Sequence, residues 1–282
     1  MNKISDNNLI QNEMEKTGLP ESRVLFLVAR SALVRYLATE FADRFWLKGG
    51  ALLYHVYDSP RVSFVDTDFA DISKHKVNEL ELENIFTIEG DGFLIAADHG
   101  QWTTEGEIIK AKVPFYLNNF RTTRGKDSKI KISVSVRQAE ILDKGEKLIY
   151  NAKGLLYGAN TFLVNGLTLE ELAAEKTLAW CLKVDLFKHY SDLALIARDF
   201  SVGFDIEKYK KMLISKFEAE KEMPETKGLY RSLRLNSPDD LFDCFSLSTK
   251  IASARKSWDF ALDQQLWFTK AEKLRETSLT DF

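Results

Sequence analysis

The sequence predicts an α+β fold in two parts, a mixed-sheet domain over residues 1–160 and a helical domain over residues 161–282. Short apolar segments separated by glycine turns fill much of the first part after its N-terminal helices, which is typical of strands. In the second part, apolar residues recur at helical spacing, as in Leu169 and Leu172. The boundary is placed in the weakly patterned stretch 151–165, and neither part contains an internal repeat.

The composition is that of an ordinary globular protein, with 45% hydrophobic and 29% charged residues among 282. A net charge of -3 gives no global signal for nucleic acid, so any phosphate-binding surface must be local. No apolar run reaches the roughly 18 residues that cross a bilayer, and no secretion signal is evident, so we expect a cytoplasmic protein without membrane contact. The four histidines show no metal-ligand spacing and are expected to be structural or solvent-facing.

The first part is expected to begin with helices and continue with alternating elements. Pro20 precedes apolar residues at helical spacing, which predicts a pair of N-terminal helices. The apolar segment 45–47 ends at a glycine turn, and a helix over 51–57 follows it. A strand is predicted over 64–70 and a further helix over 74–82.

More strands and then helices complete the predicted order. Segments 84–89 and 93–97, joined by Gly90-Asp91-Gly92, are typical of a hairpin. Further strands are predicted over 107–117 and 129–137. Amphipathic segments in the helical part lie at 190–200, 205–220, 238–255 and 258–275.

Two aspartates spaced by one residue, Asp66 and Asp68, stand in the predicted strand 64–70. Side chains of a strand alternate between its two faces, so both carboxylates point the same way. Carboxylate oxygens suit hard divalent cations, so Asp66 and Asp68 form a candidate metal site. The pattern is also that of an ordinary strand with surface-facing aspartates.

A glycine turn, Lys48-Gly49-Gly50, lies sixteen residues before the first aspartate. Glycines let the backbone approach a phosphate with no side chain in the way, and the following helix would aim its N-terminal amides at the anion. Alone, such a pair of glycines is a simple turn. Its order and spacing relative to the aspartates favour a nucleotide-binding site, whose candidate residues are Lys48, Gly49, Gly50 and Ser63.

Basic residues outnumber acidic ones by eleven to four between residues 110 and 153. Such a local excess is the electrostatic signature of a polynucleotide-binding surface. The candidate contacts are Arg121, Arg124, Lys126, Lys129 and Lys131. A charged hairpin that keeps an edge strand soluble is the alternative. The nearby aromatic residues are expected to be core residues rather than platforms for bases, and these are Phe115, Tyr116 and Phe120.

Four short motifs between residues 47 and 193 match the pattern of a known family. Leu47–Leu53 is similar to a Lys-Gly-Gly-Thr-x-Leu turn, and Arg61–Phe69 to an Arg-x-Ser-x-Asp-x-Asp-Phe strand. Glu175–Ala179 is similar to a Glu-Lys-x-x-Ala helix, and Lys188–Leu193 to an Arg-Asp-x-x-Asp-Leu motif. With these motifs the chain resembles the AbiEii/AbiGii toxin family of nucleotidyltransferases, which belongs to the DNA polymerase β-like superfamily and includes the MenT-like toxins.

The resemblance implies a toxin of a toxin–antitoxin or phage-defence system. Such a protein uses a nucleoside triphosphate (NTP) and magnesium to attach nucleotides to RNA, in some relatives to the 3′ end of tRNA. The implied partners are therefore the NTP, RNA, in particular tRNA, and a cognate AbiEi-like antitoxin. The implied fold is a polymerase β-like nucleotidyltransferase domain followed by a helical domain that completes the active-site cleft.

The resemblance also implies roles for individual residues. Asp66 and Asp68 would be the metal ligands, the Gly49-Gly50 turn would hold phosphate, Lys176 would contact the triphosphate, and Asp192 would be an acidic residue of the active site. Lys176 lies on an otherwise apolar helical face, where it must reach solvent or meet an anion. For Asp192, the alternative is a charge favoured at the start of a helix.

The chain departs from the family pattern in places. Ala51 stands where the family has a threonine or serine, and His189 stands where it has the first aspartate of the helical motif. Many polymerase β-like enzymes place a third carboxylate on a later strand, but the candidate strand 129–137 carries none. Asp71, offset by three from Asp68, falls on the opposite strand face. A catalytic base is therefore unassigned. Two alternatives stay open: transfer to a small molecule or a protein, and a catalytically inactive binding module of the same fold.

Overall fold

The structure is a computed structural model that describes residues 7–59, 66–73, 77–90, 93–117, 128–136, 146–153, 155–156, 160–181, 189, 192–193, 195–196 and 203–220. The chain divides into two compact units, Met1–Leu167 and Thr168–Phe282. The described part of the first unit combines helices with a mixed sheet, and that of the second contains helices alone. The predicted α+β class, with helices in the C-terminal part, is confirmed.

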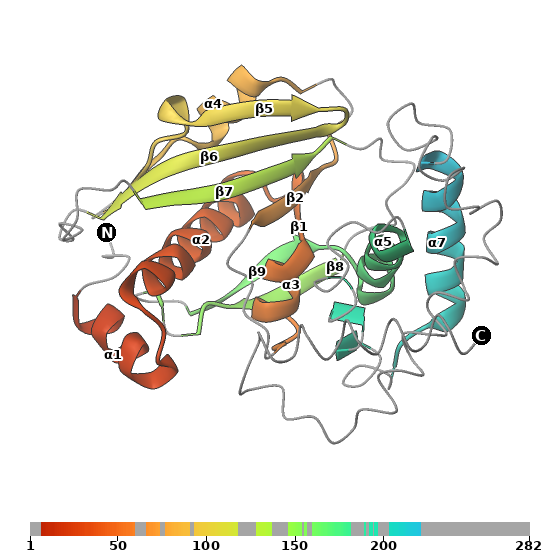
Figure 1. Ribbon diagram of the computed structural model, residues 1–282, viewed down its shortest axis with the longest axis horizontal. Helices are drawn as coiled ribbons and strands as arrows, with labels where there is room; N and C mark the ends of the chain where they lie inside the picture. The colour runs from red at the N-terminus through yellow and green to blue at the C-terminus, as the bar shows by residue number, and fades with distance from the viewer. Residues whose placement is uncertain are drawn as a thin grey trace, which may run out of the picture. The chain divides into compact units, whose positions relative to one another are not determined.

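A mixed sheet forms the centre of the first unit (Figure 1). The strands are β1 Phe45–Lys48, β2 Thr67–Asp71, β3 Ile88–Gly90, β4 Phe93–Ile95, β5 Gln101–Glu105, β6 Ile108–Leu117, β7 Ser128–Ser135, β8 Glu146–Asn151 and β9 Thr161–Gly166. Their order is β3-β4-β6-β7-β2-β1-β9-β8, with β5 also paired to β6. Because β2 pairs antiparallel with β1 and parallel with β7, the strand that carries Asp68 lies inside the sheet.

Helices accompany the sheet in the first unit. They are α1 Asn7–Thr17, α2 Glu21–Glu40, α3 Gly49–His55, α4 Glu79–Phe86 and the 3-10 turn η1 Ala97–His99. The helix α2 begins after Pro20, which fits the N-cap because it needs no backbone N–H there. It is buried over most of its middle turns and contacts β7 and β9 (Figure 1). At the start of α4, the side chain of Asn78 accepts a hydrogen bond of 2.9 Å from the backbone N–H of Glu81.

An aromatic cluster joins β1, β2 and α4. The rings of Phe45 and Phe69 each meet that of Phe86 edge to face, with centroids 5.4 and 5.9 Å away. Thr67 and Phe69 are both buried on this face of β2, whereas Asp68 between them is half-buried. Strand alternation therefore turns Asp68 away from the aromatic core.

Two packed helices, α5 Leu169–Cys181 and α7 Ile206–Glu220, lie in the second unit. Buried polar contacts link them. The hydroxyls of Thr177 and Tyr209 are 3.1 Å apart, and the buried ammonium of Lys216 lies 2.7 Å from Glu171 and 3.3 Å from Glu175. Since buried charges are tolerated only when paired, these contacts specify how α5 is rotated against α7.

Most of the predicted elements within the described residues are confirmed. The N-terminal helical pair, the helix after the glycine turn, the 88–95 hairpin, strands β6 and β7 and helix α7 all appear. The helix predicted over 74–82 instead starts at Glu79 and runs to Phe86, so residues 84–86 are helical and not part of a strand. The cap provided by Asn78 explains the later start.

Three strands were not predicted. They are β5, β8 and β9, and β9 falls in the stretch that was expected to be weakly structured. β9 exists as a strand because it pairs with β8 and, at Leu47 and Gly166, with β1. The predicted helical segments 238–255 and 258–275 lie outside the described residues.

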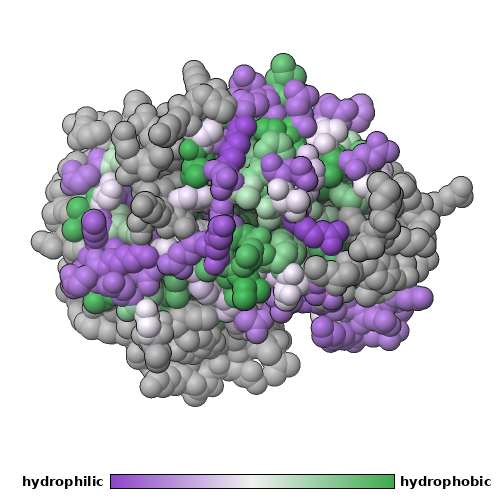
Figure 2. All heavy atoms as spheres, turned by 180° about the vertical axis from the view of Figure 1, so that it is seen from behind, coloured by the Kyte–Doolittle hydropathy of each residue, from purple (hydrophilic) through white to green (hydrophobic). Residues whose placement is uncertain are grey.

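The surface mixes polar and apolar residues. Figure 2 shows one face, on which hydrophilic residues border smaller groups of hydrophobic ones. The large apolar side chains exposed among the described residues include Leu80, Tyr116, Ile149, Leu163, Ile206 and Ile214. In the same part of the chain, no helix has the length and apolar character required to cross a bilayer.

Candidate functional site

The glycine turn and the aspartate strand lie side by side in the first unit. β1 ends at Lys48, which stands directly opposite Asp68 in the antiparallel pairing of β1 with β2. Gly49 follows with a φ of 68°, in the left-handed region, and begins α3. A Cβ on Gly49 would lie 2.1 Å from Oδ2 of Asp68, so this close approach requires a glycine. The pairing of two neighbouring strands thus joins the two motifs that the sequence singled out.

The two aspartates occupy the start of β2. Asp66 directly precedes the strand, Asp68 is its second residue, and both side chains are half-buried. On the parallel neighbour β7, Ser133 stands beside Asp68. The described residues contain no group of three or more His, Cys, Asp or Glu side chains that could hold a metal ion. On the neighbouring strand β7, the residue beside Asp68 therefore presents a hydroxyl and not a third carboxylate.

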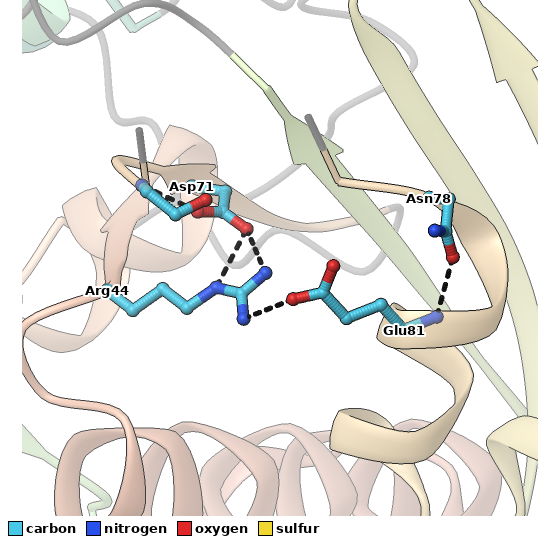
Figure 3. A network of polar contacts seen from close by, with 5 residues as sticks. Arg44, Asp71, Asn78 and Glu81 are labelled. Carbon is cyan, nitrogen blue, oxygen red and sulfur yellow. Dashed lines mark hydrogen bonds and ion pairs between the residues drawn. The ribbon is translucent and has the colours of Figure 1, made fainter. Parts of the chain in front are cut away.

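Asp71, the other carboxylate of β2, is held in a structural network (Figure 3). Nε and Nη2 of Arg44 donate to its Oδ2 at 3.0 and 2.8 Å, and the backbone N–H of Ser73 donates to its Oδ1 at 2.8 Å. Nη1 of Arg44 lies 2.7 Å from Glu81 of α4. Burial lowers the pKa of Arg44, but its hydrogen bonds to Asp71 and Glu81 outweigh burial and leave that pKa raised. Asp71 is fully buried on the core face, as its offset from Asp68 predicts.

A buried cation, Arg30 of α2, contributes to the electrostatics of the aspartate pair. Its guanidinium lies 4.6 Å from the centroid of the Phe26 ring, and the side chain is fully buried. Burial lowers the pKa of Arg30 to about 10, and the charges of Tyr150, Asp68 and Asp66 are among the groups that oppose this shift. At neutral pH the guanidinium stays charged and supplies positive potential to the two carboxylates. The sequence contains one signal for it, a single charged residue within the otherwise uncharged, mostly apolar run 24–34.

His55 belongs to the core next to this arginine, as expected for a structural histidine. Its Nδ1–H donates to the carbonyl oxygen of Asn151 at 2.8 Å, and its ring stacks on that of Tyr150 with centroids 4.4 Å apart. Burial, and then the charge of Arg30, lower the pKa of His55 well below its ordinary value. The ring is therefore uncharged at neutral pH.

Two predicted residues of the second unit pair with each other. Nζ of Lys176, on α5, lies 2.7 Å from Oδ2 of Asp192, and both side chains are buried. Lys176 therefore meets an anion and does not reach solvent. His189, which replaces an aspartate of the family motif, is half-buried.

The basic candidates are only partly within the described residues. Lys129 and Lys131 are exposed on one face of β7, which lies between β6 and β2. Protection of a sheet edge therefore does not explain these two lysines. Phe115 is a core residue as expected, but Tyr116 is 40% exposed, because strand alternation turns it to the opposite face of β6. Four candidate site residues lie outside the described residues, namely Ser63, Arg121, Arg124 and Lys126, as does the aromatic Phe120.

Comparison with known proteins adds independent findings. The sequence profile of the family described as nucleotidyl transferase AbiEii toxin, type IV toxin–antitoxin (TA) system, matches residues 31–276. Among solved structures, the chain is similar to MenT4, a nucleotidyltransferase toxin from Mycobacterium tuberculosis. The two chains are 20% identical, and the match covers 77% of this chain and 72% of that one with a TM-score of 0.56. At this identity the likeness concerns the fold. No curated protein matches the sequence.

Proposed function

The chain belongs to the AbiEii family of nucleotidyltransferase toxins of type IV toxin–antitoxin systems, and from this premise we propose that it transfers a nucleoside monophosphate from an NTP to RNA. In this proposal the reaction depends on magnesium, and the acceptor is the 3′ end of a tRNA. A cognate antitoxin would restrain the enzyme. We also propose that residues 1–160 form the polymerase β-like catalytic domain and residues 161–282 the helical domain.

The observation that carries the proposal is the contact between Gly49 and Asp68. A backbone turn with no side chain lies against a carboxylate that shares its strand face with Asp66. Phosphoryl transfer needs little covalent chemistry from a protein, and depends on positioning and on neutralising the charge of the phosphates. A turn that can hold phosphate next to carboxylates that can hold a cation meets both needs.

The two aspartates suit magnesium in particular. This ion is usually held by one or two protein carboxylates together with water and substrate phosphates. Asp66 and Asp68 offer two carboxylates on one face, so a third is not required for such a site. Bound there, magnesium would neutralise charge on the triphosphate and on the leaving group.

The proposed reaction is an in-line displacement at the α-phosphorus. The acceptor hydroxyl oxygen forms a bond to that phosphorus, the bond from phosphorus to the α–β bridging oxygen breaks, and pyrophosphate leaves. The proton of the hydroxyl passes to solvent. In this scheme the backbone of the Gly49-Gly50 turn and the side chain of Lys48 hold phosphate oxygens.

Lys176 and Asp192 are proposed to serve the same reaction from the second unit. The ammonium of Lys176 would contact the triphosphate, and the carboxylate of Asp192 would hold that ammonium in position, as it does at 2.7 Å.

The test is to incubate the purified protein with total RNA and each labelled NTP in turn, with magnesium or with a chelator. We expect one RNA class to gain label in the presence of magnesium only, and the variant Asp66→Asn to give none. Label on no RNA, although calorimetry shows that magnesium-nucleotide binds, would point to a small-molecule or protein acceptor. Failure to bind magnesium-nucleotide would point to the inactive binding module.

A further inference from the structure

Two lysines of the sheet, Lys112 on β6 and Lys131 on β7, stand directly opposite each other. Cβ atoms of directly opposed residues lie about 5 Å apart, and like charges at that separation destabilise a sheet. Both side chains are exposed, and within the described part of the chain neither has a carboxylate partner. An arrangement that opposes folding, and that no ion pair of either lysine within the described residues offsets, is expected at functional sites.

The opposed lysines lie on the same sheet face as the aspartate pair. Lys131 directly precedes Ile132, whose partner on β2 is Thr67, the residue between the two aspartates. Parallel pairing therefore brings Lys131 level with Asp66, one strand away, at the strand spacing of about 4.8 Å. Lys112 is one strand further from Asp66 in the same direction.

Two further residues extend this surface along the strands. Lys129 is the next residue of β7 on the exposed face, about 7 Å from Lys131, and stands opposite Pro114. Tyr116 follows Pro114 on the same face of β6 and is 40% exposed. We call the surface formed by Lys112, Tyr116, Lys129 and Lys131 the lysine–tyrosine face.

Lys110 is excluded from this surface because it pairs with Glu105 of β5. Lys112, Lys129 and Lys131 do not serve to keep an edge strand soluble, because β6 and β7 are both flanked by other strands. The open face of a sheet is ordinarily polar, but ordinary polarity does not favour two opposed lysines over an oppositely charged pair.

We propose that the lysine–tyrosine face binds the single-stranded 3′ end of the acceptor and leads its terminal hydroxyl to the aspartate pair. The lysines would contact backbone phosphates, and Tyr116 would stack on a base. Single strands are bound in this way by cations that follow the backbone and by exposed aromatic rings, whereas the bases of a duplex are not available for stacking. This inference rests on the function proposed above.

The test compares the double variant Lys112→Thr/Lys131→Thr with Lys147→Thr, which removes an exposed strand lysine of β8, four strands from β7. The double variant should bind a single-stranded RNA oligonucleotide about tenfold more weakly. The slope of log affinity against log salt should become shallower by about 1.4, since each phosphate contact to a single strand contributes about 0.7. Thermal stability should be unchanged or higher, and Lys147→Thr should match the unaltered protein in binding.

Kinetics separate this surface from the catalytic site. The double variant should raise KM for RNA while kcat and the affinity for NTP stay unchanged, and each single variant should give part of the effect. Tyr116→Leu should weaken binding of the single strand but not of a duplex of the same length. The inference is wrong if the double variant and the unaltered protein both label RNA with the same KM and show the same slope of log affinity against log salt. The proposed function would then still stand.

Two other outcomes are informative. If the unaltered protein labels no RNA, the proposed function fails and this inference with it. If the double variant labels RNA normally but no longer binds the antitoxin, the face is a protein-binding surface and the inference is wrong.

Discussion

No side chain fits between Gly49 and Asp68, because a Cβ on the glycine would lie 2.1 Å from Oδ2 of the aspartate. Two atoms that are not bonded cannot approach so closely. The turn after β1 and the carboxylate of β2 are therefore one structural feature, although Asp68 comes nineteen residues after Gly49 along the chain.

Gly49→Ala should abolish nucleotide transfer and weaken binding of magnesium-nucleotide in calorimetry. The added methyl group must displace the carboxylate of Asp68, besides the strain of about 1–2 kcal/mol that a left-handed φ causes. Gly18→Ala is the matched control, since Gly18 has the same φ of 68° and no atom within 4 Å of its Cβ position. Equal activity of the two variants would show that the contact with Asp68 does not matter.

Asp68→Asn and Asp71→Asn should have opposite effects although both residues belong to β2. Asp68 is half-buried on the open face, so its variant should lose transfer and keep its stability to denaturant. Asp71→Asn weakens charged hydrogen bonds from Arg44 and should lower the free energy of unfolding by about 2 kcal/mol. Chemical denaturation and transfer assays on both variants check these expectations. A stable but inactive Asp71→Asn variant would show that Asp71 serves the reaction and not the fold.

Lys176 and Asp192 can be tested with a double-mutant cycle. Lys176→Met leaves the buried carboxylate without its cation, which should destabilise the protein by about 3–5 kcal/mol. Adding Asp192→Leu should recover much of that loss, because an apolar pair can replace a buried ion pair. Transfer activity should not return in the double variant. Recovery of both stability and activity would mean that the pair is structural only.

Stability should fall in mildly acidic solution because of His55. Its pKa is lowered in the folded protein, so below its ordinary value of 6.5 the unfolded chain takes up a proton that the folded one does not. The stabilisation is fully present above pH 6.5 and is lost as the pH falls, by at most about 1.4 kcal/mol for each pH unit. His55→Asn should remove this slope in denaturation measured from pH 7 to 5, while exposed His99→Asn should not.

Local pattern was sufficient for the elements whose signals lie within one segment. α2 follows Pro20, α3 begins at the glycine turn, and apolar and polar residues alternate along β7 and over residues 109–113 of β6. β9 was missed because its strand character depends on distant partners, β8 and β1. Likewise, the start of α4 depended on a side-chain cap from Asn78 that outweighed the apolar periodicity.

For the site, the sequence alone indicated the family, the glycine turn and the shared strand face of Asp66 and Asp68. Those features depend on periods of two residues and on backbone conformation, which are local. Only the tertiary structure decided that Gly49 touches Asp68, that Ser133 stands beside it, that Asp71 belongs to Arg44, and that Lys112 opposes Lys131. Strand order and register follow from packing between distant segments, and no single segment contains that information.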